Sequence, residues 1–445
     1  MQGELVWPGD ADYDSGRTVW NVAVDRRPAV IVRAVDAEDV IAAVDFARGQ
    51  GLSVAVRGGG HSNAGFGTCD GGVLIDLSRL KHIDIDPHSR RARVEPGLTW
   101  AQVASAAHAH GLALTSGNSG SVGVGGLLLG GGIGWMARKY GLAIDRLRAV
   151  ELVTASGHFV RASATQHADL FWGLRGGGGN LGVATAFEVE LHPGGTVLGG
   201  VPVFDVAQIE GVLPSLARLA LAAPDELTTD TAIALAPPVP FIPAQWHGRP
   251  VMAVMLCYTG NLAEGERVIA PLRKLAEPIA DTVAPLPYPA LFQLTQQQSE
   301  ERLRVNTRSY YLRPPHSRGL DALARLVPTL VSAESMVELK IAGGAVGRVP
   351  HSATAYAHRD TPVLVACLTG GPDAAGDGRR QELLQRFEAV MRPHATGSYV
   401  NAMGYDEADR SLDAYSPATY ARLVALKRRY DPTNMFRHNQ NVTPD

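Results

Sequence analysis

A histidine follows three consecutive glycines in residues 57–62, which read RGGGHS. Glycine tolerates positive φ angles and lets a ligand approach the main chain closely. The backbone N–H groups of Gly58, Gly59 and Gly60 could therefore face a bulky or anionic molecule. This arrangement would place His61 at the rim of that molecule.

A second glycine-rich stretch begins about 60 residues later, where residues 117–135 read GNSGSVGVGGLLLGGGIGW. The two phosphates of a dinucleotide need several backbone donors, and two glycine-rich loops supply them without a cationic pocket. FAD fits such a cradle. Glycines that only form turns would explain isolated pairs, but they explain this density of glycine poorly.

A third run, GGGGNLG at residues 176–182, has the GxGxxG spacing of a dinucleotide fingerprint. That fingerprint requires a strand before it and a helix after it. Here the helical segment DLFWGLR precedes the run and the alternating segment VATAFEVEL follows it. The reversed order argues against an NAD-dependent dehydrogenase. The sequence also lacks a P-loop, a GxSxG and an HExxH motif, so the commonest phosphoryl-transfer, hydrolase and zinc-protease sites are not expected.

Composition and charge favour small-molecule partners. The net charge is −3 and no long Lys/Arg run occurs, so binding to nucleic acid or an anionic membrane is not expected. The first residues do not resemble a signal peptide and no apolar run reaches about 18 residues, which favours a cytoplasmic protein. Three widely spaced cysteines, Cys69, Cys257 and Cys367, are interpreted as free buried thiols, and no metal site is expected.

The elements that position these loops follow from periodicity. A first α+β unit ends near residue 113, with a strand at 29–35, a helix at Ala37–Gln50 ended by Gly51, a strand at Leu52–Val56, paired strands between 71 and 97, and a helix at 100–110. A second unit contains the second glycine run, a strand at Ala149–Ala155, a helix at Asp169–Leu174 and a strand at Val183–Leu191.

Beyond residue 200 the chain changes character. The segments 251–260, 335–344 and 361–370 read as strands that alternate with amphipathic helices. This pattern is typical of an antiparallel sheet covered by helices on one face. A last helix is expected at Pro417–Arg429.

Six ordered motifs now carry a resemblance: VRGGGHS, GGVLIDLS, VGVGGLLLGGGIGWMARKYGLAIDRL, GGGGNLGVATAFEVEL, TAYAHRD and YDPTNMFRHNQNV. In this order they resemble the berberine bridge enzyme-like flavoprotein oxidases of the vanillyl-alcohol oxidase superfamily, the bacterial members most of all. The resemblance spans nearly the whole chain and is weak only at residues 205–335, the segment that it implies would hold the substrate.

The resemblance implies an α+β fold with a two-part FAD-binding domain of the vanillyl-alcohol oxidase type. That domain would span residues 1–205, with parts at about 1–113 and 114–205. A substrate domain would span residues 206–398, and residues 399–445 would return to the FAD-binding domain.

The resemblance also implies how the cofactor is held. A ring nitrogen of His61 would bond covalently to the 8α carbon of the flavin. Many members have a cysteine that bonds flavin C6, but Ser119 stands at that position here, so a single attachment is expected. The other expected FAD contacts are Arg57, Gly58, Gly59, Gly60, Ser62, Gly65, Gly117, Ser121, Val122, Gly123, Gly125, Gly126, Gly131, Gly132, Tyr140, Gly182, Val183, Asn439 and Asn441.

Two residues that the resemblance places near the flavin bear on catalysis. Val122 occupies the position of a gate for dioxygen, and its small side chain would leave space for O2, as in an oxidase. Tyr399 and Asn401 belong to a Tyr-Val-Asn that resembles the family's YxN motif. The family often has a second tyrosine directly after this motif, serving as the base. Ala402 stands there, which argues against a tyrosinate mechanism.

The substrate sheet offers other candidates for the base. Glu338 and Lys340 are two residues apart and would share one face of a strand, either pointing at the flavin or forming an ion pair in solvent. Three tyrosines, Tyr258, Tyr310 and Tyr311, are expected to line the substrate pocket. Charged residues are sparse around these segments, which favours an apolar or aromatic substrate.

The resulting hypothesis is an oxidase that passes a hydride from an alcohol, amine or related C–H centre to FAD and returns the electrons to O2 as H2O2. One alternative is a natural-product tailoring enzyme that oxygenates or cyclises its substrate. Another is a non-catalytic flavin-binding protein. The oligomeric state stays open between a monomer and a homodimer.

Overall fold

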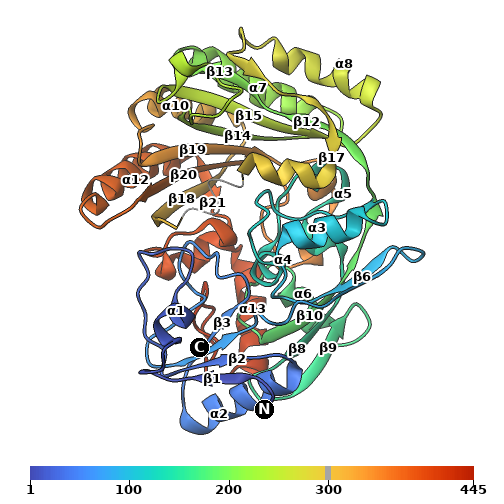
Figure 1. Cartoon of the computed structure of the whole chain (residues 1–445), viewed down its shortest axis with the longest axis vertical. Coiled ribbons are helices and arrows are strands. Elements are labelled where there is room, and N and C mark those ends of the chain that lie inside the picture. The colour runs from blue at the N-terminus through green and yellow to red at the C-terminus, as the bar shows by residue number, and fades with distance from the viewer. Residues whose placement is uncertain (296–301) are drawn as a thin grey trace.

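The computed structural model describes residues 1–295 and 302–445. Figure 1 shows two halves along the long axis: a large helix-covered sheet in the upper half, and two smaller sheets with both chain ends in the lower half. The fold is α+β, as the sequence predicts. Among the described residues, no helix is both long and apolar enough to cross a membrane.

The first sheet carries the RGGGHS segment at the end of one strand. Its order is β1-β2-β4-β3, with parallel pairing of β2, β4 and β3. The strands are β1 (Glu4–Val6), β2 (Val30–Arg33), β3 (Val54–Arg57) and β4 (Val73–Asp76). Helix α2 (Ala37–Gln50) has the predicted bounds, because Asp36 caps its first turn and Gly51, with φ of 64°, ends it.

The second sheet is antiparallel and has the order β5-β6-β10-β8-β9. Its strands are β5 (Ile83–Asp86), β6 (Arg91–Val94), β8 (Leu147–Val153), β9 (Phe159–Ser163) and β10 (Val183–Glu190). Helices α3 (Trp100–His108) and α6 (Ala168–Leu174) and the short pair β7 (Leu112–Ala113) and β11 (His192–Pro193) accompany it. The run at 176–182 therefore lies between a helix and a strand, in the predicted reversed order.

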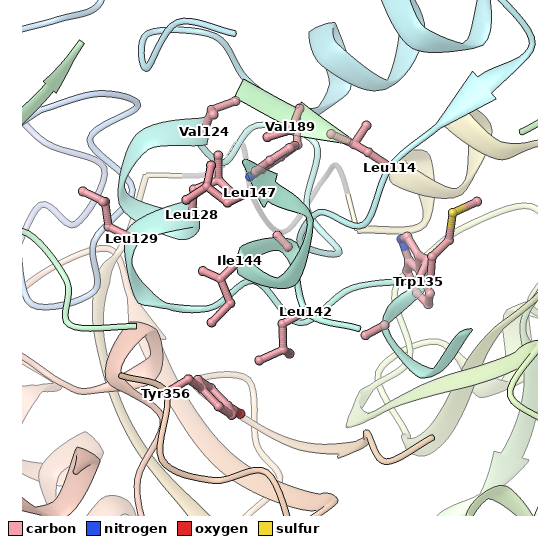
Figure 2. Close-up of a cluster of buried hydrophobic side chains, with 14 of the residues drawn as sticks. Leu114, Val124, Leu128, Leu129, Trp135, Leu142, Ile144, Leu147, Val189 and Tyr356 are labelled. Carbon is pink, nitrogen blue, oxygen red and sulfur yellow. The ribbon is translucent and has the colours of Figure 1, made fainter. Parts of the chain in front are cut away.

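The second glycine run is only partly a loop. Residues Val124–Gly130 form helix α4, and the short helix α5 (Ala137–Tyr140) follows. Val124 and Leu128 of α4 are fully buried in the cluster drawn in Figure 2, where they lie with Ile144 and Leu147. This packing stabilises a helix despite its glycine content, because tertiary burial outweighs propensity.

The third sheet has ten strands within residues 1–295 and 302–445, paired antiparallel. They are β12 (Thr196–Gly200), β13 (Pro202–Asp205), β14 (Leu227–Leu235), β15 (Pro250–Tyr258), β16 (Ala280–Asp281), β17 (Ala284–Pro287), β18 (Arg304–Leu312), β19 (Ser335–Ile341), β20 (Val363–Gly371) and β21 (Ala395–Gly397). The helices that share a hydrophobic core with this sheet are α7 (Ile209–Ala222), α8 (Leu262–Arg273), α10 (Ser317–Leu326) and α12 (Asp377–Met391).

Strand β19 shows how the two faces of this sheet differ. Val337, Leu339 and Ile341 are buried in the hydrophobic core shared with the helices. The alternate residues, among them Glu338 and Lys340, face away from that core because successive side chains of a strand point to opposite faces. The sheet is therefore covered by helices on one face, and its other face is turned toward the lower half of the molecule (Figure 1).

The C-terminal segment returns to the lower half. Helix α13 (Pro417–Tyr430) packs on α6, and the Val54 N–H donates to the Met435 carbonyl at 3.0 Å. Lys427 and Asp431 form an ion pair with both side chains fully buried. The Lys427 ammonium also donates to the Asn180 and Phe436 carbonyls, so it ties α13 to the third glycine run.

Candidate functional site

A cavity of about 640 Å³ lies between the glycine segments and the uncovered face of the large sheet. Its lining joins four parts of the chain that are distant in sequence. They are residues 57–63, residues 117–129, the run at 178–184, and the C-terminal residues 436–440. The sheet face closes the opposite side through residues of β14, β19 and β20.

The first two glycine segments touch through their backbones. A Cβ built on Gly59 would lie 2.6 Å from the amide nitrogen of Gly123, and one built on Gly123 would lie 2.4 Å from the amide nitrogen of Gly59. Contacts that short do not occur for real side chains, so these positions need glycine. Gly58, Gly125 and Gly126 continue this lining, which leaves main-chain groups exposed to a ligand.

His61 lies at the rim of this backbone surface. Its Nε2 is 3.2 Å from the Ser121 hydroxyl, and its ring stacks on Trp20 with centroids 4.4 Å apart. Arg57, which precedes the glycines, donates to Asp76 at 2.7 Å and to the Thr18 carbonyl at 3.0 Å. The imidazole is therefore oriented by a hydroxyl from the second glycine segment and by an aromatic ring.

The C-terminal loop adds polar groups to the cavity. Asn439 donates its amide to the Phe436 carbonyl at 2.9 Å, while its buried Oδ1 has no hydrogen-bond partner among the described residues. His438 lies 2.9 Å from the Ser53 hydroxyl, and burial lowers its pKa to about 4, so it is neutral at pH 7. An unpaired buried amide oxygen beside a cradle that side chains would fill fits a bound dinucleotide.

Three ionisable side chains face each other on the sheet side. The Lys340 ammonium donates to Asp230 Oδ2 at 2.5 Å and lies 3.5 Å from Glu338 Oε2. Asn118, from the second glycine segment, donates its amide to the same Asp230 oxygen. The predicted shared face of Glu338 and Lys340 is present in β19, and both residues line the cavity rather than the protein surface.

Burial shifts the protonation of this group. It raises the pKa of Glu338, an effect that Asp230 reinforces and Lys340 opposes. Burial works to lower the pKa of Lys340, but the charges of Asp230 and Glu338 outweigh it and raise that pKa. Lys340 is therefore held as a cation at neutral pH.

Tyr399 and Asn401 form a second polar group beside α4. The Tyr399 hydroxyl accepts hydrogen bonds from the Gly132 N–H at 2.8 Å and from the Asn401 amide at 3.1 Å. The Asn401 amide also donates to the Leu127 carbonyl at 3.2 Å. Burial raises the pKa of Tyr399, opposed by these donors and by Lys340. Both residues line the cavity, and their bonds fix the C-terminal end of α4.

The three tyrosines expected in the substrate pocket lie elsewhere. Tyr258 and Tyr310 are buried in the core between the sheet and its helices, on the face away from the cavity. Tyr311 is fully buried behind Tyr399, where its hydroxyl bonds that of Tyr356. That expectation is wrong, because strand alternation and the covering helices place these side chains in hydrophobic cores and not on the cavity wall.

Several expected FAD contacts also lie outside the lining residues. Tyr140 stacks on His192 with centroids 3.7 Å apart, and Gly65 packs against Val24. Gly131 and Gly132 shape the end of α4, with positive φ angles of 146° and 86°. The remaining three are Val183, which is buried in the core below the first sheet, Asn441, and Ser121, whose hydroxyl lies 3.2 Å from His61 Nε2.

The cavity wall includes the other expected contacts Ser62, Gly117, Val122 and Gly182, and also Ser119, which stands at the position of the family's cysteine. Asp230 and Asn118 were not expected. The one sequence signal for Asp230 is a charged residue within LTTDTAIAL, a strand whose first seven residues are all buried. Its partner across the strand pair could not be read from the sequence.

Comparisons with known proteins show the family to which the chain belongs. Residues 28–163 match an FAD binding domain, and residues 398–443 match a family described as berberine and berberine like. The chain is 32% identical over 457 positions to (R)-6-hydroxynicotine oxidase of Paenarthrobacter nicotinovorans, covering 100% of this chain and 97% of that protein. It is 27% identical to a chitooligosaccharide oxidase of Gibberella zeae, covering 100% and 92%.

A solved structure shows the same fold. The crystal structure of 6-hydroxy-D-nicotine oxidase from Arthrobacter nicotinovorans superimposes with a TM-score of 0.89 at 30% identity, covering 100% of this chain and 98% of that one. The similarity therefore includes both the glycine segments and the large sheet that face each other across the cavity.

Proposed function

Since the chain belongs to the berberine bridge enzyme-like family of FAD-linked oxidases, we propose that it oxidises an alcohol, amine or related C–H centre of a small metabolite and returns the electrons to O2 as H2O2. The observation that carries this proposal is the facing pair of surfaces in one cavity. A backbone cradle with His61 forms one side, and Glu338 with Lys340 lies on the other.

We propose that FAD is held by a single covalent bond to His61, with Ser119 in place of a second tether. The main chain at Gly58, Gly59 and Gly123 would contact the cofactor, and Asn439 Oδ1 would accept a hydrogen bond from it. When bound, FAD would supply the acceptor for the two electrons that leave the substrate carbon as hydride.

The chain's own residues then position the substrate and take its proton. Oxidation of a C–H next to O–H or N–H releases a hydride and, from the heteroatom, a proton. Glu338 is the carboxylate that would receive that proton, because its pKa is raised and its partner Lys340 stays charged. Tyr399 and Asn401, which are bonded to α4, would hold the wall beside the reacting centre.

The cavity wall also suits reaction with dioxygen. Val122 lines the cavity between Ser121 and Gly123, and its small side chain would leave room for O2. Apolar residues of the sheet, Met255, Met336 and Leu364, border the polar group. The substrate would accordingly combine a polar end with an apolar body.

The test uses the purified protein and its His61→Ala variant. The wild-type polypeptide should exceed its sequence mass by one FAD and stay yellow after acid precipitation, whereas the variant should match its sequence mass. A screen of sugars, aromatic alcohols and cyclic amines should then give H2O2 with one class. A colourless wild-type chain of sequence mass would remove the covalent link, and turnover without H2O2 would remove the oxidase reaction.

A further inference from the structure

The charged group on the large sheet is built by strand pairing. In the antiparallel register of β14 and β19, Asp230 stands directly opposite Lys340, and Ala232 stands opposite Glu338. Directly opposed side chains have Cβ atoms about 4.5–5.5 Å apart, so Lys340 reaches Asp230 without distortion. On the other flank, Leu364 and Ala366 of β20 stand opposite Lys340 and Glu338. The group is therefore bordered by apolar residues on that side.

The three side chains lie at different depths. The Asp230 side chain is 3% exposed, whereas those of Lys340 and Glu338 are 21% and 23% exposed. Asp230 therefore lies deepest, and the other two are nearer the open part of the cavity. Lys340 is the cation of the three side chains, and it forms ion pairs with both carboxylates.

Hydrogen-bond acceptors are left over at this face. Asp230 Oδ1 and Asn118 Oδ1 are both buried without a partner among the described residues. The orientation of Asn118 is fixed, because its amide donates to Asp230 Oδ2 and its backbone carbonyl accepts from Thr295 at 3.0 Å. With Glu338, the face presents three acceptor sites, while its cation is already engaged. Unpaired buried acceptors are costly, so they indicate a ligand that donates hydrogen bonds.

The other charged residues of the lining are compensated. Arg57 is paired with Asp76 at 2.7 Å, and Glu334 is paired with Arg380 at 3.0 Å. With both carboxylates ionised, Asp230, Glu338 and Lys340 sum to one negative charge. An arriving cation would favour the ionised form of Glu338, whereas an anion would meet two carboxylates.

We propose that Asp230, Glu338 and Asn118 form a subsite for a protonated amine, with Asp230 as the residue that sets this specificity. This rests on the proposed function and narrows its substrate to one that carries an ammonium N–H donor on an apolar body. Neutral alcohols can donate to the same acceptors but gain no charge interaction, and carboxylates are repelled. Lys340 pairs with Asp230 and is not itself the substrate's partner.

The experiment compares three probes of equal ring size, benzylammonium, benzyl alcohol and benzoate, on the FAD-containing protein by isothermal titration calorimetry at neutral pH. Benzylammonium should bind about tenfold or more tighter than benzyl alcohol, and benzoate weakest. Asp230→Asn should remove most of that preference, and Glu338→Gln should reduce it even if the first variant folds poorly. Asp225→Asn, which alters a carboxylate paired with Arg348, is the matched control and should leave it unchanged.

Three results would overturn the subsite: no binding of benzylammonium, benzoate binding as tightly as benzylammonium, or an unchanged preference in both variants. The flavin content of each sample is measured separately by acid precipitation. A protein that retains flavin and releases H2O2 from an alcohol, yet shows no preference for the cation, would refute the subsite alone. A protein without flavin would refute the proposed function.

Discussion

Gly59 and Gly123 meet backbone to backbone, so closely that neither position has space for a Cβ. This contact joins the segment after β3 to the segment before α4, which are the two halves of the cradle. Its geometry explains why glycine is concentrated at both segments: the two main chains approach each other here, and a ligand can approach them both.

Replacing Gly59 with alanine should therefore separate the two segments. We expect Gly59→Ala to lower the free energy of unfolding by about 1–3 kcal/mol through overpacking, and to reduce the flavin content of the purified protein. Thermal unfolding and flavin absorbance measure the two effects. Gly49→Ala is the control, because a Cβ at this position of α2 meets nothing within 4 Å. The free energy of unfolding of that variant should rise by about 0.5–1 kcal/mol. Equal effects of the two substitutions would contradict the contact.

The Ser121 hydroxyl, 3.2 Å from His61 Nε2, should orient the imidazole for its reaction with the flavin. We expect Ser121→Ala to slow covalent attachment about tenfold or less, because a neutral hydrogen bond contributes about 1 kcal/mol. The measurement is the fraction of flavin that stays with acid-precipitated protein over time after FAD is added to the flavin-free protein. Ser119→Ala, which alters a serine of the cavity wall, is the control. Attachment at the same rate in both variants would show that Ser121 does not orient His61.

The buried pair of Lys427 and Asp431 should be essential for stability. Lys427→Met leaves the Asp431 carboxylate buried without its cation, so we expect a loss of about 3–5 kcal/mol in denaturant unfolding. Arg267→Met breaks an exposed pair with Glu264 and should cost about 1 kcal/mol or less. A Lys427→Met protein that unfolds at the wild-type denaturant midpoint would rule out this role.

His192 should make the fold sensitive to acid. Burial, aided by nearby arginines and lysine, lowers its pKa from 6.5 to about 3. Between these pH values the unfolded chain binds a proton that the folded chain does not, so the contribution of His192 is complete above pH 6.5 and is lost as the pH falls toward 3. The free energy of unfolding then falls by up to about 1.4 kcal/mol for each pH unit.

His192→Phe keeps an aromatic ring against Tyr140 and removes the titrating group. The variant should lose stability less steeply than the wild type between pH 6.5 and 3, measured by urea unfolding at a series of pH values. His110→Gln, at an exposed position, should keep the wild-type slope. If the His192→Phe protein showed the wild-type slope as well, protonation of this histidine would not drive acid unfolding.

Local patterns predicted the parts of the fold that depend on local signals. Helix α2 could be read from its periodicity and Gly51, and the order around residues 176–182 from a helical segment followed by strict alternation. Helix α4 was not predicted, because its many glycines indicate a loop. The helix is stabilised by burial of Val124 and Leu128, whose contact partners lie far along the chain. Burial by distant residues is not visible in a short window of sequence.

Local patterns likewise predict some residues of the candidate site, while others depend on long-range strand pairing. The glycine cradle and the shared face of Glu338 and Lys340 follow from residue type and the two-residue period of a strand. Asp230 could not be assigned, because its role depends on the register between β14 and β19, which are separated by about a hundred residues. The prediction that Tyr310 and Tyr311 of β18 line the substrate pocket was wrong for a related reason. These adjacent side chains point to opposite faces of the strand, and both faces are buried there.

The return of the C-terminal segment has a consequence for biosynthesis. Residues 436–440 form part of the cavity wall, and Lys427 bonds the carbonyls of Asn180 and Phe436. The ribosome makes the first two sheets before residues 436–440, so a nascent chain that has not reached residue 436 lacks this part of the cavity wall. The wall is therefore complete only in a chain that extends beyond these residues.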